Sequence, residues 1–284
     1  MSTPVALVLG GHGLLGQPLA QQLAGNGWEA QSLDFEDCNL LNPVELQPRI
    51  EFINPDVIFN TVSWNTENPA EKQPQEALSV NRGLPAFLGG LVKGTSRFLV
   101  HYSSDQVFNG RKDSPYTEED KADPISLCGK SRPPVSRPCR AQRRQHLHHP
   151  YGLAVRPGWD NFLKRLLGRA KTEGTVEVIH DQIGSPTYAK DLAQATLQLV
   201  KRRAPGLYHV ANSGQATWCE LAAEAVRQAS LPCSVRAVAS SDKTLRANYE
   251  VLSSAKYTAL TGCPMRPWSQ ALREYIYSVL LASQ

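Results

Sequence analysis

The chain has 284 residues, of which 41% are hydrophobic and 20% charged, and this balance is typical of a soluble globular protein. No apolar run approaches the roughly 18 residues that a membrane span requires. The amino terminus has neither the basic segment nor the small-residue cleavage site of a signal peptide. We therefore expect a cytoplasmic protein without a membrane partner, folded as two lobes or two closely joined domains.

The net charge of +4 arises from a single segment. Between Lys130 and Arg156 there are seven Lys or Arg residues and no Asp or Glu, and without them the chain has 23 basic and 26 acidic residues. This segment lacks the interleaved aromatic residues or the basic helix face of a nucleic-acid-binding surface. We expect no nucleic-acid partner.

The pattern of cysteine and histidine does not indicate a metal site. The six cysteines lie far apart without a C-x-x-C pair, which favours reduced thiols over a disulfide framework. His146, His148 and His149 are close together in sequence but have no neighbouring Cys or acidic residue. We interpret them as solvated histidines in a disordered segment and expect no bound metal.

The first half of the chain alternates apolar strands with helical patterns. Val5–Leu9 is a continuous apolar run bounded by glycine, which is typical of a strand buried on both faces of a parallel sheet. After it we expect a helix at Leu14–Leu23, a strand at Trp28–Leu33, a helix at Val44–Ile50, a strand at Val57–Val62, a helix at Ala77–Val92 and a strand at Phe98–Ser103. The alternation predicts right-handed βαβ units and an α/β fold with a doubly wound parallel sheet.

The second half contains more helix than strand. Thr217 with Glu220 three residues later predicts a capping box at the start of a helix. The expected elements are helices at Asn161–Ala170, Ala189–Lys201, Thr217–Ala229 and Pro267–Leu281, and strands at Val176–Ile179 and Leu207–Val210. We assign residues 1–160 and about 176–212 to a nucleotide-binding Rossmann domain, and about 161–175 with 213–284 to a smaller substrate-binding lobe.

A glycine motif follows the first predicted strand and begins the first predicted helix. In Gly10-Gly11-His12-Gly13-Leu14-Leu15-Gly16, the first glycine permits the tight turn, Gly13 lets the backbone approach a pyrophosphate, and Gly16 allows close helix packing. Helix N–H groups would then face the phosphates. The motif in this context predicts dinucleotide binding.

Asp34, at the end of the second predicted strand, indicates which dinucleotide is bound. A carboxylate there accepts hydrogen bonds from the adenosine ribose 2′-hydroxyl and disfavours a 2′-phosphate. No arginine near the loop would bind that phosphate, so the residues favour NADH, with NADPH left open. The candidate cofactor-binding residues are Gly10, His12, Gly13, Leu14, Leu15, Gly16, Asp34, Asn39, Leu40, Thr61, Val62, Ser63 and Asn81.

Several further segments share a pattern with one known family. They are Asn60–Trp64, Ser79–Asn81, Val100–Gly110, Pro115–Asp120, Asp181–Ala189 and Gly206–Ala211. With the glycine motif they make the chain resemble the dTDP-4-dehydrorhamnose reductases, which are extended short-chain dehydrogenase/reductases. The resemblance extends over most of the chain except about residues 128–157.

The resemblance implies an activity and a set of site residues. It implies reduction of the 4-keto group of dTDP-4-dehydro-L-rhamnose to dTDP-L-rhamnose with NADPH or NADH, in a possible homodimer. In the family a tyrosine donates the proton, a lysine lowers the pKa of that tyrosine, and a Ser or Thr assists at the carbonyl. By this resemblance Ser104 and Asp105 contact the substrate and take part in catalysis, and Trp218 and Arg246 line the sugar side.

The chain departs from the family at the catalytic pair. Where the family reads Tyr-Gly-Lys-Ser/Thr-Lys, residues 128–132 read Cys-Gly-Lys-Ser-Arg, so Cys128 and Arg132 occupy the tyrosine and lysine positions. A thiol can donate a proton but reaches less far than a phenol, and arginine keeps the charge without the compact geometry of lysine. Gln106 also replaces a tyrosine common in the family. We expect cofactor binding with strongly reduced turnover.

Residues 132–157 have no apolar periodicity and no clear strand, and Pro133, Pro134 and Pro138 disfavour a long helix. Three explanations compete: a divergent loop in place of the catalytic helix, a basic segment for an acidic partner, and a stretch translated from a shifted reading frame. We favour the third, because the family pattern resumes at Pro157–Phe162.

A second class of function stays open. The regulatory subunit of methionine adenosyltransferase is similar to this family, so a nucleotide-binding regulatory subunit without turnover is the alternative. The tyrosine and lysine pair discriminates between the two, and its absence here favours the alternative.

The reading-frame hypothesis predicts a specific gene sequence. If Gly152–Pro157 were encoded GGC-CTG-GCT-GTT-CGG-CCC, a shifted reading would give Trp-Leu-Phe-Gly, the string that precedes the Pro-Gly segment in the family. Sequencing the gene tests this, and we expect a pair of compensating shifts around this segment. An uninterrupted frame would refute the hypothesis.

Overall fold

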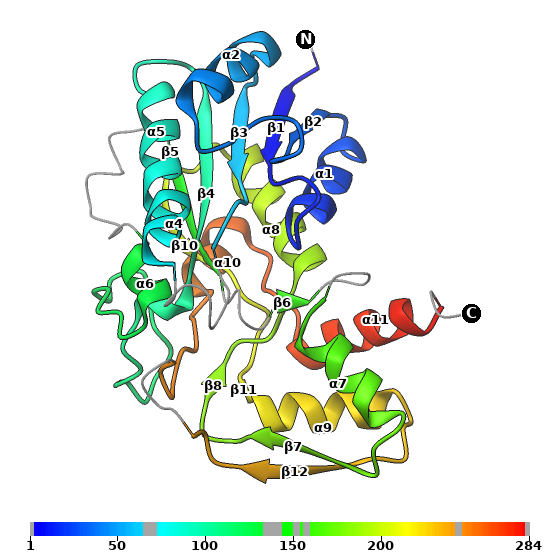
Figure 1. Ribbon diagram of the computed structural model, residues 1–284. Coiled ribbons are helices and arrows are strands. Elements are labelled where there is room, and N and C mark those ends of the chain that lie inside the picture. The colour runs from blue at the N-terminus through cyan, green and yellow to red at the C-terminus, as the bar shows by residue number, and fades with distance from the viewer. Residues whose placement is uncertain are drawn as a thin grey trace.

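A computed structural model gives the structure of residues 3–64, 73–132, 144–149, 154–155, 160–241 and 246–281. The chain forms a parallel sheet covered on both faces by helices, and a second, smaller lobe below it (Figure 1). Among these residues no helix is long and apolar enough to cross a bilayer.

The larger sheet contains six strands that are all parallel, in the order β10-β5-β4-β3-β1-β2. In chain order the strands are β1 (Val5–Leu9), β2 (Glu29–Leu33), β3 (Val57–Asn60), β4 (Phe98–Ser104), β5 (Arg144–His149) and β10 (Gly206–His209). β1 pairs with β2 on one side and β3 on the other, so the chain reverses its direction of travel across the sheet at β1. This is the doubly wound topology that the sequence predicts.

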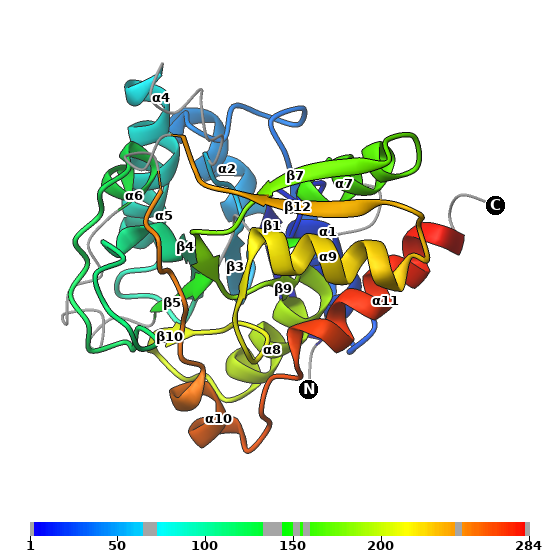
Figure 2. The ribbon, with the colours of Figure 1, turned by 90° about the horizontal axis from the view of Figure 1, so that it is seen from below.

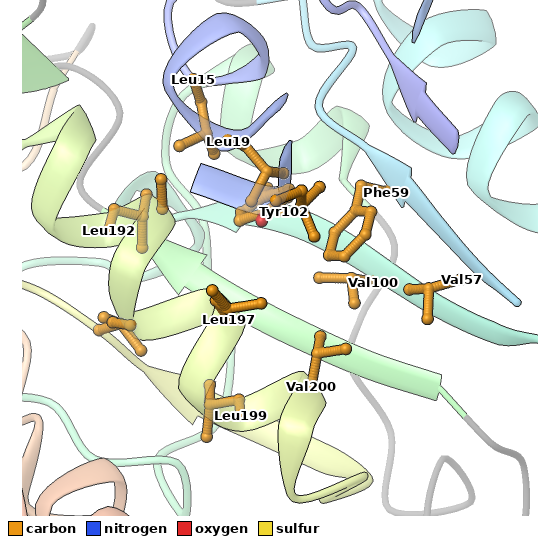
Figure 3. Packing of buried hydrophobic residues seen from close by; sticks show 14 of the residues in the cluster. Leu15, Leu19, Val57, Phe59, Val100, Tyr102, Leu192, Leu197, Leu199 and Val200 are labelled. Atoms are coloured by element: carbon orange, nitrogen blue, oxygen red, sulfur yellow. The ribbon is translucent and has the colours of Figure 1, made fainter. Parts of the chain in front are cut away.

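Each face of the sheet packs against its own layer of helices. On one side α1 (Gly16–Ala24) and α8 (Ala189–Lys201) cover alternate strand residues such as Val8, Phe59 and Val100 (Figure 3). On the other side α2 (Pro43–Ile53) and α5 (Leu84–Leu91) cover the intervening residues, which include Leu7, Ile58 and Leu99. Because successive strand side chains point to opposite faces, both alternating sets are buried, which explains the continuous apolar runs.

The predicted helix over Ala77–Val92 is a continuous helical stretch of three parts. α4 (Pro74–Leu78) leads into a π-helical turn at Ser79–Gly83, which leads into α5. Pro85, the second residue of α5, lacks the N–H of an α-helical hydrogen bond, and the wider turn lies just before it. The turn also places Asn81, which is 1% exposed, on the side that faces the loop after β3.

The expectation that residues 132–157 contain no strand is wrong. Residues 144–149 form β5, which pairs with β4 on one side and β10 on the other. The segment contains neither proline nor glycine, so each residue can supply the backbone N–H and C=O that a central strand needs. His146, His148 and His149 therefore belong to a strand and not to a disordered segment.

The second lobe has its own hydrophobic core. β7 (Thr175–Ile179) pairs with β12 (Ser234–Val238), and Figure 2 shows the two strands side by side above α9 (Trp218–Gln228). α7 (Phe162–Ala170) and α11 (Trp268–Leu281) complete this core. Thr217 and Glu220 form the predicted capping box at the start of α9.

Short elements connect the lobes, and the sequence patterns did not indicate them. They are β8 (Ile183–Gly184), which pairs with β11 (Ala216–Thr217), β9 (Thr187–Tyr188), which pairs with β6 (Ala154–Val155), and α10 (Ala255–Thr261). β7 packs in the core of the second lobe, whereas we assigned residues from about 176 to the nucleotide-binding domain. The predicted domain boundaries otherwise stay a prediction.

His209, at the end of β10, is a buried titratable group in the fold. It is fully shielded from solvent, its Nδ1 lies 3.0 Å from the carbonyl oxygen of Tyr116, and its ring packs edge-on against Phe108. Burial disfavours the cation and lowers the pKa of His209 to about 4.

The lowered pKa predicts acid sensitivity. Because the folded pKa lies below the unfolded value of 6.5, the stability contributed by neutral His209 is complete above pH 6.5 and is lost as the pH falls towards 4. The wild-type chain should lose about 2 kcal/mol more than His209→Asn between roughly pH 7 and pH 5. Urea unfolding of both proteins at the two pH values measures this, and parallel losses would contradict it.

Candidate active site

The candidate site lies at one edge of the larger sheet, where three adjacent strands end. The glycine motif follows β1, residues 61–64 follow β3, and Ser104 ends β4. Because β3 lies between β1 and β4 in a parallel sheet, the carboxyl ends of all three strands meet at this edge. The sequence predictions for the cofactor and for the carbonyl of the substrate thus fall on neighbouring segments.

The glycine motif forms a tight loop in which Gly10, Gly13 and Gly16 leave no room for side chains of their own. Gly10 has φ +80°, a conformation that favours glycine, and its carbonyl oxygen accepts a hydrogen bond from the N–H of Gly13 at 3.0 Å. A Cβ on Gly13 would lie 3.0 Å from that oxygen, and a Cβ on Gly16 would overlap it. The first turn of α1 has no side-chain cap. Its N–H groups and the open loop fit a dinucleotide pyrophosphate.

Asp34 faces the same loop from the end of β2. Both carboxylate oxygens lie 3.3 Å from the backbone N–H of His12, and the nearer one is 3.4 Å from His12 Nδ1. The side chain of Asp34 is 15% exposed and that of His12 is 75% exposed. The carboxylate therefore lies beside the phosphate loop, where it can accept a hydrogen bond from a ribose hydroxyl.

Three of the residues predicted to bind the cofactor have buried side chains. Leu14, Leu15 and Leu40 are at most 4% exposed, and Leu15 lies near Leu19 in the cluster that also contains Leu192 of α8 (Figure 3). Asn39 is exposed and stabilises the turn before α2, because its N–H donates to Glu45 Oε2 at 2.9 Å. These leucines can contribute only backbone atoms to a cofactor site.

Asn81 ties the loop after β3 to the helix that carries Cys128. Its side-chain oxygen accepts from the N–H of Trp64 at 2.9 Å, and its amide donates to the Trp64 carbonyl and to Ser131 Oγ, the latter at 2.7 Å. Thr61 Oγ1 donates to the Leu9 carbonyl at 2.7 Å, which fixes the loop to β1. Of the predicted residues, Thr61 and Asn81 thus hold the site together.

Cys128 and Arg132 lie together at the end of this loop. α6 (Leu127–Ser131) is a single turn, and Arg132 caps it in an extended conformation with φ −80° and ψ 144°. The residue before a proline disfavours the α region, so Pro133 in the sequence accounts for the early end of the helix. The expectation of a shortened helix is confirmed for the part of this segment that the structure describes.

The thiol and the guanidinium contact the loop rather than open solvent. Cys128 is 7% exposed and its Sγ donates to the Trp64 carbonyl at 3.5 Å. Arg132 donates from Nη2 to Ser63 Oγ at 2.9 Å, and the same atom lies 3.9 Å from Cys128 Sγ. The two residues at the family's tyrosine and lysine positions are therefore adjacent, and they lie beside the predicted cofactor-contacting stretch.

Gln106 supports α6 from the turn after β4. It is 8% exposed, and its Oε1 accepts a hydrogen bond from Ser126 Oγ at 3.2 Å. Ser126 in turn caps α6, because its Oγ accepts from the N–H of Gly129 at 3.0 Å. A Cβ on Gly129 would overlap the Gln106 carbonyl oxygen, so α6 packs directly on this turn.

Ser104 and Asp105 form a hydrogen-bonded pair. Ser104 Oγ donates to Asp105 Oδ1 at 2.8 Å and accepts from the N–H of Gln106 at 3.2 Å. Both residues are at most 1% exposed. Asp105 Oδ2 has no hydrogen-bond partner among the described residues. Burial raises the pKa of Asp105, and Arg246 opposes this effect most strongly among the neighbouring groups.

A buried arginine joins this pair to the second lobe. Arg246 Nη2 lies 3.8 Å from Asp105 Oδ2, and Nε donates to Glu250 Oε2 at 2.7 Å. The guanidinium also lies 5.2 Å above the ring of Trp218. The structure thus brings together all four predicted catalytic and substrate residues of this side: Ser104, Asp105, Trp218 and Arg246.

Sequence reasoning missed Glu250 and Ser131. Glu250 is 2% exposed, and burial raises its pKa to about 7, against the opposing charge of Arg246. An Arg and a Glu four residues apart in a loop give no signal of burial, because the same spacing is common on exposed helices. Ser131 lies in the 128–132 stretch, in which roles were predicted only for Cys128 and Arg132.

The comparisons with known proteins agree with this architecture. The family model described as RmlD substrate binding domain matches residues 5–281. The spore coat polysaccharide biosynthesis protein SpsK of Bacillus subtilis is 33% identical over 276 residues, which cover 95% of this chain and 96% of the relative. The dTDP-4-keto-6-deoxy-D-glucose reductase of Streptomyces niveus is 30% identical over 94% of this chain and 95% of its own length.

Solved structures show the same fold. The dTDP-4-dehydrorhamnose reductase ortholog of Clostridium acetobutylicum superposes with a TM-score of 0.90 at 26% identity, and covers 97% of this chain and 99% of that one. The dTDP-4-dehydrorhamnose reductase of Bacillus anthracis in complex with NADP gives 0.89 at 23% identity over the same shares.

The fold and the glycine loop define the chain as a member of the dinucleotide-binding Rossmann class. It belongs to the RmlD substrate binding domain family, to which the dTDP-4-dehydrorhamnose reductases are similar in sequence and fold. The predicted family, fold class and NAD(P)H-dependent oxidoreductase relationship are confirmed. The roles of individual site residues stay predictions.

The geometry of the loop predicts the effect of a single methyl group. Gly13→Ala should weaken binding of NADH or NADPH about tenfold or more, because its Cβ would crowd the Gly10 carbonyl and the path of the pyrophosphate. Quenching of protein fluorescence by the dinucleotide measures the affinity. Gly90→Ala on α5 is the control, since a Cβ there meets nothing within 4 Å. Equal affinities of the two variants would contradict the assignment.

Proposed function

We propose that this chain is a sugar-nucleotide reductase that transfers a hydride from NADPH or NADH to the 4-keto group of dTDP-4-dehydro-L-rhamnose, which gives dTDP-L-rhamnose. The observation that carries the proposal is the meeting of three groups at one sheet edge: the glycine loop, Ser104 at the end of β4, and the Cys128–Arg132 pair on α6. Family membership supports the substrate class.

Different residues of the chain would bind the cofactor, bind the sugar and stabilise the reacting carbonyl. The bound dinucleotide supplies the hydride. Gly10, Gly13 and Gly16 leave space for its phosphates, and Asp34 accepts from its adenosine ribose. Ser104, held by Asp105 and by the N–H of Gln106, offers a hydroxyl where negative charge develops on the carbonyl oxygen. Trp218 and Arg246 lie on the sugar side.

The replaced pair should slow this reaction. The thiol of Cys128 donates to the Trp64 carbonyl, and its side chain is shorter than the tyrosine of the family. Arg132 keeps a positive charge beside Ser63 but spreads it over a planar group. Loss of a positioned general acid costs about 10²–10⁴ in rate, so we propose turnover reduced by a factor in this range.

The alternative function is a nucleotide-binding regulatory subunit without turnover. The altered catalytic pair favours it, whereas the relatives named as reductases favour the enzyme. A homodimer and a cytoplasmic location complete the proposal. Sedimentation of the purified chain tests the first, and fractionation of the source cells tests the second.

Restoring the family pair tests the enzyme directly. Cys128→Tyr with Arg132→Lys should raise turnover of the dTDP-4-keto sugar over that of the unmodified chain, by about tenfold or more, if a phenol and an ammonium can occupy these positions. The loss of nicotinamide absorbance measures the rate. Cofactor affinity is measured beside the rate, because Arg132 donates to Ser63 in the predicted cofactor-contacting stretch.

Two results would contradict the proposal. Turnover by the unmodified chain at the rate of a tyrosine-containing relative, assayed beside it, would show that the pair is dispensable. Cofactor and sugar binding with no turnover in either protein would favour the regulatory alternative.

A further inference from the structure

Two carboxyl groups and one guanidinium lie together in the candidate site, away from water. Asp105, Arg246 and Glu250 are 0%, 7% and 2% exposed. They come from distant parts of the chain, since Asp105 follows β4 and the other two flank residues 247–249 near the second lobe. A buried group of this kind is costly unless its charges balance.

Among these three groups, the charges balance when one of the two carboxyl groups is protonated. Glu250 holds the nearer contact to Arg246, at 2.7 Å, while Asp105 Oδ2 is 3.8 Å from that guanidinium. Arg132 also lowers the pKa of Asp105, but less than Arg246 does, and its guanidinium donates to Ser63. Because Arg246 lies closer to Glu250 than to Asp105, Asp105 is the carboxyl group that keeps the proton.

A protonated Asp105 has a direct route to the reacting carbonyl. Asp105 Oδ1 and Ser104 Oγ are 2.8 Å apart, which suits transfer of a proton in either direction. Ser104 Oγ also accepts from the N–H of Gln106, which fixes its position at the end of β4. The thiol of Cys128 is directed at the Trp64 carbonyl instead.

We propose that Asp105, Arg246 and Glu250 hold one proton between their two carboxyl groups, and that Asp105 passes it through Ser104 to the carbonyl oxygen of the substrate. Glu250 is a positioning residue, because it occupies Arg246 and thereby keeps Asp105 protonated. The inference rests on the proposed reductase function and names the proton source in a chain that lacks the tyrosine.

A bound reduced nicotinamide would supply the hydride that forms the C–H bond at C4, and a pair of electrons would then be left on the carbonyl oxygen. That oxygen takes the proton of Ser104 as the Oγ–H bond breaks, and Ser104 takes the proton of Asp105. Asp105 becomes a carboxylate beside Arg246 and regains a proton from water after the product leaves.

Glu250→Gln is the decisive variant. It keeps a hydrogen-bond acceptor for Arg246 but removes one negative charge, so Arg246 should then pair with Asp105 and draw the proton away. In the ligand-free chain, the infrared carbonyl band of a protonated carboxyl group should vanish at a lower pH in the variant than in the wild type. This readout does not depend on turnover.

Turnover supplies the second readout. In the wild type, the rate of 4-keto reduction should fall as the pH rises through the titration of the cluster, because the proton donor is lost. In Glu250→Gln this limb should move down by about one pH unit or more, which makes the rate at neutral pH about tenfold lower. The affinity for the dinucleotide should not change.

Glu173→Gln is the matched control, because Glu173 also pairs with an arginine four residues earlier, Arg169, but on an exposed helix end. It should alter neither readout. Asp105→Asn provides a second variant should Glu250→Gln unfold, and it should abolish the infrared band near neutrality.

The outcomes separate the two proposals. An infrared titration that is the same in wild type and in Glu250→Gln would overturn the shared proton. An unchanged pH limb in an active variant would overturn the route through Asp105. A wild-type chain that shows the infrared titration but no turnover at any pH would overturn the reductase function, and the donor assignment with it, and leave the shared proton standing.

Discussion

The parallel pairing of β1, β3 and β4 is the constraint on which the site depends. Backbone hydrogen bonds fix the register of these strands, and burial on both faces fixes which residues point to each layer of helices. Since all three strands end at one edge, the glycine loop, the Thr61–Trp64 stretch and Ser104 become neighbours although they lie far apart in the sequence. A slip of one residue in β4 would turn Ser104 to the opposite face.

α6 keeps its place although it is only one turn long. Side-chain hydrogen bonds hold this short helix in position. Asn81 joins it to the loop after β3, and Ser126 joins it to Gln106. Each buried hydrogen bond contributes about 1 kcal/mol, and each one left unmade costs more. The prolines after Arg132 act against continuation of the helix, so the side-chain hydrogen bonds are what hold Cys128 and Arg132 beside Ser63.

The sequence predicted the parts of the fold that leave a local pattern. Apolar runs marked β1, β3 and β4, and the glycine spacing marked the loop, because one strand or one turn determines each pattern. The sequence of β5 has no apolar run, because pairing with the strands on both sides requires only backbone N–H and C=O groups. The role of Glu250 was not predictable either, because Asp105, with which it interacts, lies far away in the sequence. Leu14, Leu15 and Leu40 were predicted to bind the cofactor, and their side chains are buried in the core, which the sequence did not indicate.

The replaced catalytic pair at residues 128 and 132 and the buried Asp105–Arg246–Glu250 cluster both bear on which group donates the proton. A tyrosine donor needs a nearby cation to lower its pKa, and a lysine serves both that donor and the cofactor. With a thiol at residue 128, the cation at Arg132 no longer has a phenol to act on, and it contacts Ser63 instead. The acid beside Ser104 is then Asp105. Burial makes a charge on Asp105 costly, and for the same reason it keeps the carboxyl group from ionising. A neutral acid hydrogen-bonded to Ser104 can do what the phenol does, provided that Arg246 stays with Glu250. We therefore propose that the protonation of this edge of the sheet is set chiefly from the second lobe through Arg246, with a smaller effect from Arg132 at the end of α6.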